Sequence, residues 1–131
     1  MSPRILIVED EALVALEIEA IIEDLGLSAV GIAPDRRTAL HLARENPDIA
    51  LVDLHLRDGL TGPDIGRELA ERGVSVVFVT ANPRLVAKGV PGAYGVIEKP
   101  TEETLIADAI AYAMQRRGGQ AATPPANLIA F

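Results

Sequence analysis

Short apolar runs alternate along the chain with longer segments of helical periodicity. The runs at 5–8, 28–33, 49–52, 74–79 and 95–97 are rich in aliphatic residues, which is typical of strands buried on both faces of a parallel sheet. Segments 12–25, 35–45, 61–72 and 101–117 place apolar residues at helical spacing, and a shorter helix is expected over 82–88. Five strand–helix repeats predict an α/β fold with right-handed crossovers.

Turn and capping residues set the expected limits of the helices. Gly26 and Gly73 follow the first and third helices as C-terminal stops. Asp35 is expected to cap the second helix, and Thr101 the last. The second helix ends before Pro47, because a residue that precedes proline disfavours the helical conformation.

The chain has 131 residues, the size of one ordinary domain, and 49% of them are hydrophobic, enough for a packed core. We expect one domain over residues 1–117 and a flexible tail over 118–131, which begins with two glycines and contains two consecutive prolines. The last four residues of the tail are apolar, and they can either dock on the domain or stay unstructured.

Charge and composition narrow the function classes. The net charge of −7 opposes binding to nucleic acid and to anionic membranes, whereas clustered carboxylates can attract a hard cation such as Mg²⁺. The absence of cysteine excludes disulfides, thiolate metal sites and cysteine nucleophiles. The sequence shows neither a signal-peptide core nor an apolar run of membrane-spanning length, so we expect a cytoplasmic protein.

Polar residues with complementary chemistry stand at four of the five predicted strand ends. Glu9 and Asp10 follow the first strand, Asp53 the third, Thr80 the fourth and Lys99 the fifth. In an open parallel sheet, ligands bind outside the carboxyl ends of the strands. We therefore expect these side chains to meet at one edge of the sheet.

The chemistry of this set favours phosphoryl transfer. Carboxylates that repel one another need a cation, and Mg²⁺ prefers oxygen ligands and is often shared with a phosphate. Asp53 can act as a nucleophile that forms an acyl phosphate. Lys99 can pair with Asp53 and then with the phosphoryl group, to which the Thr80 hydroxyl can donate a hydrogen bond.

Each of these residues also has a purely structural interpretation when it is taken alone. Acids such as Glu9 and Asp10 suit the start of a helix, while Asp53, Thr80 and the pair Lys99–Pro100 suit turns. The joint placement of all of them at successive strand ends is much harder to explain by turn chemistry. It therefore supports the phosphoryl-transfer site.

The order and spacing of these pieces resemble the receiver domains of bacterial response regulators. The matching pieces are residues 5–11, 51–54, 78–81 and 98–100, and the resemblance extends from Arg4 to about Gln115. It implies a flavodoxin-like, doubly wound (βα)5 fold with a five-stranded parallel sheet of strand order 2-1-3-4-5. The segment 58–62 and the pattern Phe78-x-Thr80 resemble receivers of a general-stress-response subgroup.

The resemblance also implies roles for individual residues. Asp53 would be the phosphoacceptor, with Lys99 and Thr80 contacting the phosphoryl group and Ala81 leaving room for it. The Mg²⁺ ligands would be Asp10, Asp53 and the backbone carbonyl of His55. Glu9, which replaces the usual Asp, would act through a bound water. The peptide between Lys99 and Pro100 is expected to be cis.

One departure concerns the switch aromatic that many receivers carry three residues before the lysine. That position is Val96 here, and Tyr94 lies two residues earlier, on the same face of the strand if the period of two holds.

The implied partners are a histidine kinase or histidine phosphotransfer protein as donor and an unknown downstream protein. Leu16 and Ala20, off the main apolar face of the first helix, are candidates for partner contact. A homodimer through the 82–88 helix, the 95–97 strand and the last helix is left open.

Three functions compete at this point. The first is a signalling switch phosphorylated on Asp53, which is not an enzyme beyond its own phosphorylation and dephosphorylation. The second is a degenerate receiver that acts as a phosphorylation-independent interaction module. The third is a small enzyme of the same architecture, but the sequence contains neither G-x-x-x-x-G-K-[ST] nor G-x-G-x-x-G, and His55 stands where a phosphatase with an Asp nucleophile would have a second acid.

Overall fold

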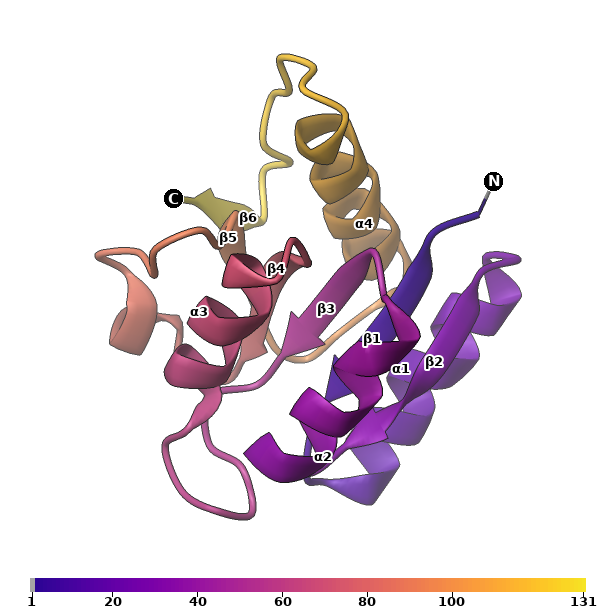
Figure 1. Cartoon of the computed structure of the whole chain (residues 1–131). Helices are drawn as coiled ribbons and strands as arrows, with labels where there is room; N and C mark the ends of the chain where they lie inside the picture. The colour runs from indigo at the N-terminus through magenta and orange to yellow at the C-terminus, as the bar shows by residue number, and fades with distance from the viewer. Residues whose placement is uncertain (1) are drawn as a thin grey trace.

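The computed structural model describes residues 2–131, which fold into one six-stranded sheet between two layers of helices (Figure 1). The elements in chain order are β1 (Arg4–Val8), α1 (Ala12–Asp24), β2 (Ser28–Ala33), α2 (Arg36–Leu42), the 3₁₀ turn η1 (Ala43–Glu45), β3 (Ile49–Val52), α3 (Gly62–Glu71), β4 (Ser75–Thr80), the 3₁₀ turn η2 (Pro83–Val86), β5 (Gly95–Glu98), α4 (Glu103–Arg117) and β6 (Leu128–Ala130).

The sheet buries both of its faces. Its strand order is β2-β1-β3-β4-β5-β6, and the first five strands pair in parallel, which confirms the predicted order. One core cluster lies between the sheet and α2 and α3, and includes Phe78 and Leu69. The other lies under α1 and α4, and includes Ile18 and Ile106. This two-sided burial explains why the strands are continuous apolar runs rather than alternating ones.

The ends of the helices follow the sequence in part. Asp35 caps α2 as predicted, because its Oδ1 accepts a hydrogen bond from the Thr38 amide at 2.9 Å. Thr101 does not cap α4, which begins at Glu103 after Glu102, so that prediction was wrong. The helix expected over 82–88 is only the short turn η2, since Gly89 and Gly92 take positive φ angles of 92° and 83° that end helical structure.

The prediction of a purely parallel five-stranded sheet needs a correction at its edge. Residues 128–130, within the expected flexible tail, form β6 and pair antiparallel with β5. Leu128 is buried in the α1–α4 core, and the Phe131 ring packs 6.2 Å from that of Phe78. Three apolar residues after a proline-rich stretch are too short a run to show strand periodicity.

Close approach of β6 depends on the absence of a side chain at Gly95. A Cβ there would lie 2.6 Å from the Ile129 carbonyl oxygen. We predict that Gly95→Ala lowers the free energy of unfolding by about 1–2 kcal/mol and speeds hydrogen exchange of the Phe131 amide, which donates to the Tyr94 carbonyl at 3.0 Å. In a chain that lacks residues 127–131 the same substitution should be nearly neutral. Equal destabilisation in both backgrounds would contradict this account.

Candidate functional site

The carboxyl ends of β1, β3, β4 and β5 bring the predicted side chains to one edge of the sheet. Backbone hydrogen bonds fix the residues just past these ends: the Asp53 amide donates to the Val8 carbonyl and the Lys99 amide to the Thr80 carbonyl, both at 2.9 Å. The strand register therefore positions Asp53 beside Glu9, and Lys99 directly after Glu98, which is the register partner of Thr80. Among residues 2–131, the predicted meeting of these side chains at one edge of the sheet is confirmed.

Lys99 lies between two buried carboxylates. Its Nζ is 2.5 Å from Oε1 of Glu9 and 2.9 Å from Oδ2 of Asp53. The other oxygen of Asp53, Oδ1, accepts a hydrogen bond from the Leu54 amide at 2.7 Å, and Oε2 of Glu9 accepts one from the Glu11 amide at 3.1 Å. All four carboxylate oxygens thus face a donor, which orients both groups.

Three acids form the only group of metal-ligand type among residues 2–131. Oxygen atoms of Glu9, Asp10 and Asp53 lie within 4.8 Å of one another. Glu9 and Asp53 are buried, whereas Asp10 is exposed. One lysine cannot neutralise three carboxylates, so this all-oxygen set suits a hard dication such as Mg²⁺.

An open hollow of about 290 Å³ adjoins these groups. It is wide enough for several waters, each of which occupies about 30 Å³ in the liquid. Thr80 borders the hollow, and its Oγ1 accepts a hydrogen bond from the Asn82 amide at 3.1 Å. The lining residues are Asp10, Glu11, Val14, Asp53, His55, Thr80, Ala81, Asn82 and Lys99.

Burial and hydrogen bonding shift the pKa values of Glu9 and Lys99. Desolvation raises the pKa of Glu9 to about 7, against the lowering effect of the hydrogen bond from Lys99. Burial by itself would lower the pKa of Lys99, but its hydrogen bonds to Glu9 and Asp53 outweigh this, and the net shift is upward. Lys99 therefore stays charged, while the charge of Glu9 depends on pH near neutrality.

This shift predicts a pH dependence of stability in metal-free buffer. Because the folded-state pKa of Glu9, about 7, exceeds its ordinary value of 4.5, the folded chain binds a proton that the unfolded chain releases between these pH values. The free energy of unfolding should then fall as pH rises from 5 to 8, by about 2 kcal/mol. In Glu9→Gln that part of the fall should be absent. Parallel pH profiles of the two proteins in urea titrations would contradict the assignment.

Two contributors to the site have little signal in the sequence. The Leu54 amide holds Asp53, and any residue except proline supplies such a donor. Gly62, the first residue of α3, packs against the Asp53–Leu54 peptide so closely that a Cβ would lie 2.0 Å from the Asp53 carbonyl oxygen. The Gly62–Pro63 pair indicates a helix start, but nothing in it indicates contact with Asp53.

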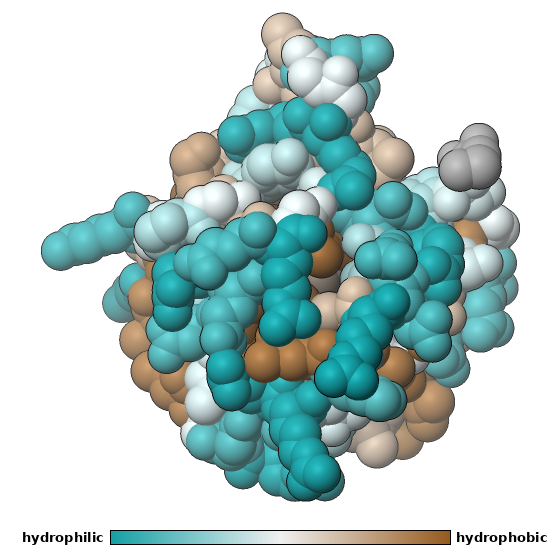
Figure 2. All heavy atoms as spheres, viewed as in Figure 1, coloured by the Kyte–Doolittle hydropathy of each residue, from teal (hydrophilic) through white to brown (hydrophobic). Residues whose placement is uncertain are grey.

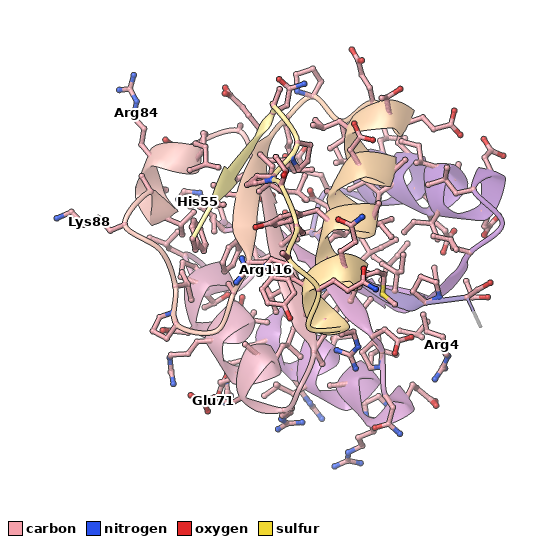
Figure 3. The ribbon with its side chains drawn as sticks, turned by 90° about the horizontal axis from the view of Figure 1, so that it is seen from above. Arg4, His55, Glu71, Arg84, Lys88 and Arg116 are labelled. Carbon is pink, nitrogen blue, oxygen red and sulfur yellow. The ribbon has the colours of Figure 1, made fainter. Side chains whose placement is uncertain are left out.

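Val96 and Tyr94 do not share a face of the sheet. Val96 is buried in the α2–α3 core, whereas Tyr94 precedes β5 and packs in the α1–α4 core. The Arg116 guanidinium, labelled in Figure 3, lies 4.4 Å from the centroid of the Tyr94 ring. The expectation of a shared face was wrong because the period of two holds only within the strand, which begins at Gly95. The peptide between Lys99 and Pro100 is cis, as expected.

A hollow at the strand ends of a doubly wound sheet, with three acids, a threonine and a lysine, is the architecture of a receiver domain. The family described as "Response regulator receiver domain" matches residues 5–111, so the chain belongs to this family. Its relatives include proteins named PhyR. The Phyllosphere-induced regulator PhyR of Methylorubrum extorquens is 36% identical over 118 residues, covering 87% of this chain and 44% of that protein.

Solved structures similar to this chain also include PhyR proteins. One described as the PhyR stress response regulator is 32% identical with a TM-score of 0.74, covering 89% of this chain and 46% of that one. Another, described as anti-anti-sigma factor PhyR from Bartonella quintana, is 27% identical with a TM-score of 0.77, covering 91% and 50%. The chain thus spans about half the length of these three PhyR proteins. These relatives agree with the expected stress-response subgroup.

The helices carry no membrane-spanning signal. From residue 2 to residue 131, none of them is both long enough and apolar enough to cross a bilayer.

Proposed function

We propose that this receiver domain accepts a phosphoryl group on Asp53 and thereby switches a partner protein. The observation that carries the proposal is the contact of Lys99 with Asp53 beside a hollow that Asp10, Thr80 and Ala81 also line. The presence of acids, a hydroxyl and an ammonium group at one edge of the sheet is explained more simply by phosphoryl transfer than by a purely structural role for each residue.

The transfer is a displacement at phosphorus. A carboxylate oxygen of Asp53 forms a bond to the phosphorus of a phosphohistidine on the donor, while the phosphorus–nitrogen bond breaks and its electron pair stays on the imidazole, which takes up a proton. The product is an acyl phosphate on Asp53. Attack of water on that phosphorus releases inorganic phosphate and restores the carboxylate.

Each residue of the site would have a separate role in the transfer. Lys99, which is hydrogen-bonded to Asp53, would follow the negative charge onto a phosphoryl oxygen. The Thr80 hydroxyl, whose oxygen accepts from the Asn82 amide, would donate its hydrogen to a second phosphoryl oxygen. Asp10, Asp53 and the His55 carbonyl would hold Mg²⁺, with Glu9 acting through water. When bound, this ion supplies charge neutralisation for the carboxylates and the phosphoryl group.

Glu9 sets a condition on this scheme. Since it is longer than Asp by one methylene, it reaches Lys99 directly at 2.5 Å. For Lys99 to turn to a phosphoryl group, that pair has to loosen. The same pair would favour the degenerate-receiver alternative if it held Lys99 permanently.

The output is proposed to be protein binding. One PhyR relative is described as an anti-anti-sigma factor, so a regulatory protein is the class of downstream partner that fits. Donor docking is proposed on α1, where Leu13 and Leu16 are 77% and 54% exposed. A homodimer through η2, β5 and α4 would have to accommodate β6, which covers the edge of β5.

Incubation with acetyl phosphate and Mg²⁺ tests the proposal. Intact-protein mass spectrometry should show a gain of one phosphoryl group in the wild type, no gain in Asp53→Asn, and no gain in the wild type with EDTA. Asp58→Asn, which alters an exposed acid on the loop after β3, should behave as the wild type. No gain in the wild type would support the interaction module, and a gain in Asp53→Asn would place the acceptor elsewhere.

A further inference from the structure

Arginines gather on one side of this acidic protein. Two adjoining hollows, of about 740 Å³ and 420 Å³, share Arg44 and Arg72 in their linings, and we treat them together as one groove. It begins between α2 and α3 and continues past the start of β3 to the end of α4. Six exposed arginines line it: Arg36, Arg37, Arg44, Arg57, Arg72 and Arg117.

The charge of the groove is opposite to that of the chain. It holds six of the twelve Lys and Arg residues in a chain of net charge −7, so the remaining surface is more acidic than the total indicates. Figure 2 shows this side of the molecule, where hydrophilic residues predominate over α2 and α3 and hydrophobic ones show between them. We call it the arginine groove.

Half of these arginines are already neutralised within the protein. Arg36 pairs with Glu68 at 2.6 Å, Arg57 pairs with Asp35, and Arg117 with Asp48 at 3.7 Å. The other three arginines have no carboxylate within ion-pair distance anywhere in residues 2–131, and they are Arg37, Arg44 and Arg72.

We propose that the arginine groove is a docking site for an acidic segment of a partner protein. Planar guanidinium groups bind carboxylates through two parallel hydrogen bonds, and three of them here are free to do so. Complementary charge over a groove of this length would also speed encounter with such a partner.

Nucleic acid is the less suitable occupant. No Phe, Tyr or Trp lines the groove to stack a base. A polyphosphate chain longer than the groove would also meet the acidic remainder of the surface. A short acidic peptide, by contrast, would extend only over the positively charged groove and would not reach the acidic remainder of the surface.

The groove is also in contact with the loop that follows Asp53. Arg57 lies four residues after Asp53 on the loop that leads to α3, and its amide donates to the Pro34 carbonyl at 3.0 Å, next to the Asp35 cap of α2. Occupation of the groove would therefore touch the loop that carries Asp53, although the docking itself requires no phosphorylation.

Binding of a fluorescein-labelled oligo-glutamate peptide, followed by fluorescence anisotropy, tests the proposal. The wild type should bind at low ionic strength and lose the peptide at high ionic strength. Arg37→Glu combined with Arg44→Glu should weaken binding by at least about tenfold, which is 1.4 kcal/mol. The matched control is Arg84→Glu with Lys88→Glu, which makes the same charge change at side chains that extend away from the body of the protein (Figure 3) and should bind nearly as the wild type.

Three results would overturn the proposal. Absence of peptide binding to the wild type would do so, and an equal loss in both double variants would mean nonspecific attraction. Tighter binding of an oligothymidylate of the same charge, lost in Arg37→Glu/Arg44→Glu alone, would assign the groove to nucleic acid instead. Circular dichroism of both variants checks that they are folded.

Discussion

Lys99→Met is expected to slow phosphorylation of the protein by acetyl phosphate by on the order of a hundredfold, the usual cost of removing one preorganised charge from a transition state. The ammonium group lies 2.9 Å from Oδ2 of Asp53 and at the border of the hollow where a phosphoryl group would sit. Methionine keeps most of the stem but carries no charge. The rate of mass gain measures the effect, and Lys88→Met, an exposed lysine on the loop before β5, is the matched control.

The same substitution is expected to change the pH dependence of stability. Without Lys99, Glu9 and Asp53 lose their shared cation, and removing one partner of a buried ion pair leaves an uncompensated charge. At pH 8 in metal-free buffer, the free energy of unfolding should fall by about 3 kcal/mol. At pH 5, where Glu9 is protonated because its pKa is about 7 in the wild type, the loss should be smaller, because only Asp53 then loses an ion pair with Lys99. A loss independent of pH would show that Lys99 stabilises the fold by packing of its stem instead.

Much of the site was predictable because its residues lie immediately after strands. Burial on both faces makes a parallel strand a continuous apolar run, so its last residue is visible in the sequence, and the fold rule places all such ends at one edge. That argument located Asp10, Asp53, Thr80 and Lys99 without any knowledge of contacts. The hydrogen bond between Lys99 and Glu9 could not be predicted in this way, because the rotamer of a buried acid depends on which cation lies nearest to it in the folded protein.

The parts that escaped prediction depend on contacts distant in sequence. Residues 128–130 become a strand only because β5 offers an unpaired edge and Gly95 leaves room for their backbone. The segment 82–88 has helical composition, but it forms only a short turn before two glycines with positive φ. The helix α4 begins at Glu103 rather than after Thr101, because capping preferences differ between neighbouring residues by small energies and do not fix a helix start to within a residue or two.

Gly62→Ala is expected to be among the most damaging single substitutions in this protein. A Cβ at this position would lie 2.0 Å from the carbonyl oxygen of Asp53 and 2.5 Å from Cα of Leu54. Both are backbone atoms next to a buried strand, so they cannot move aside as a flexible side chain would. The added methyl group has to displace either the start of α3 or the Asp53–Leu54 peptide, at a cost of about 3 kcal/mol or more.

The displacement should also impair function, because the Leu54 amide that orients Oδ1 of Asp53 belongs to the displaced peptide. Acetyl phosphate should therefore phosphorylate Gly62→Ala more slowly than wild type even at temperatures where the variant is fully folded by circular dichroism. Gly118→Ala is the matched control: its φ of −76° suits alanine and its Cβ would have no contact closer than 3.5 Å. Normal stability and normal phosphorylation of Gly62→Ala would mean that α3 can shift away from the strand end without moving Asp53. The packing of this helix on the Asp53–Leu54 peptide would then not position the Asp53 side chain.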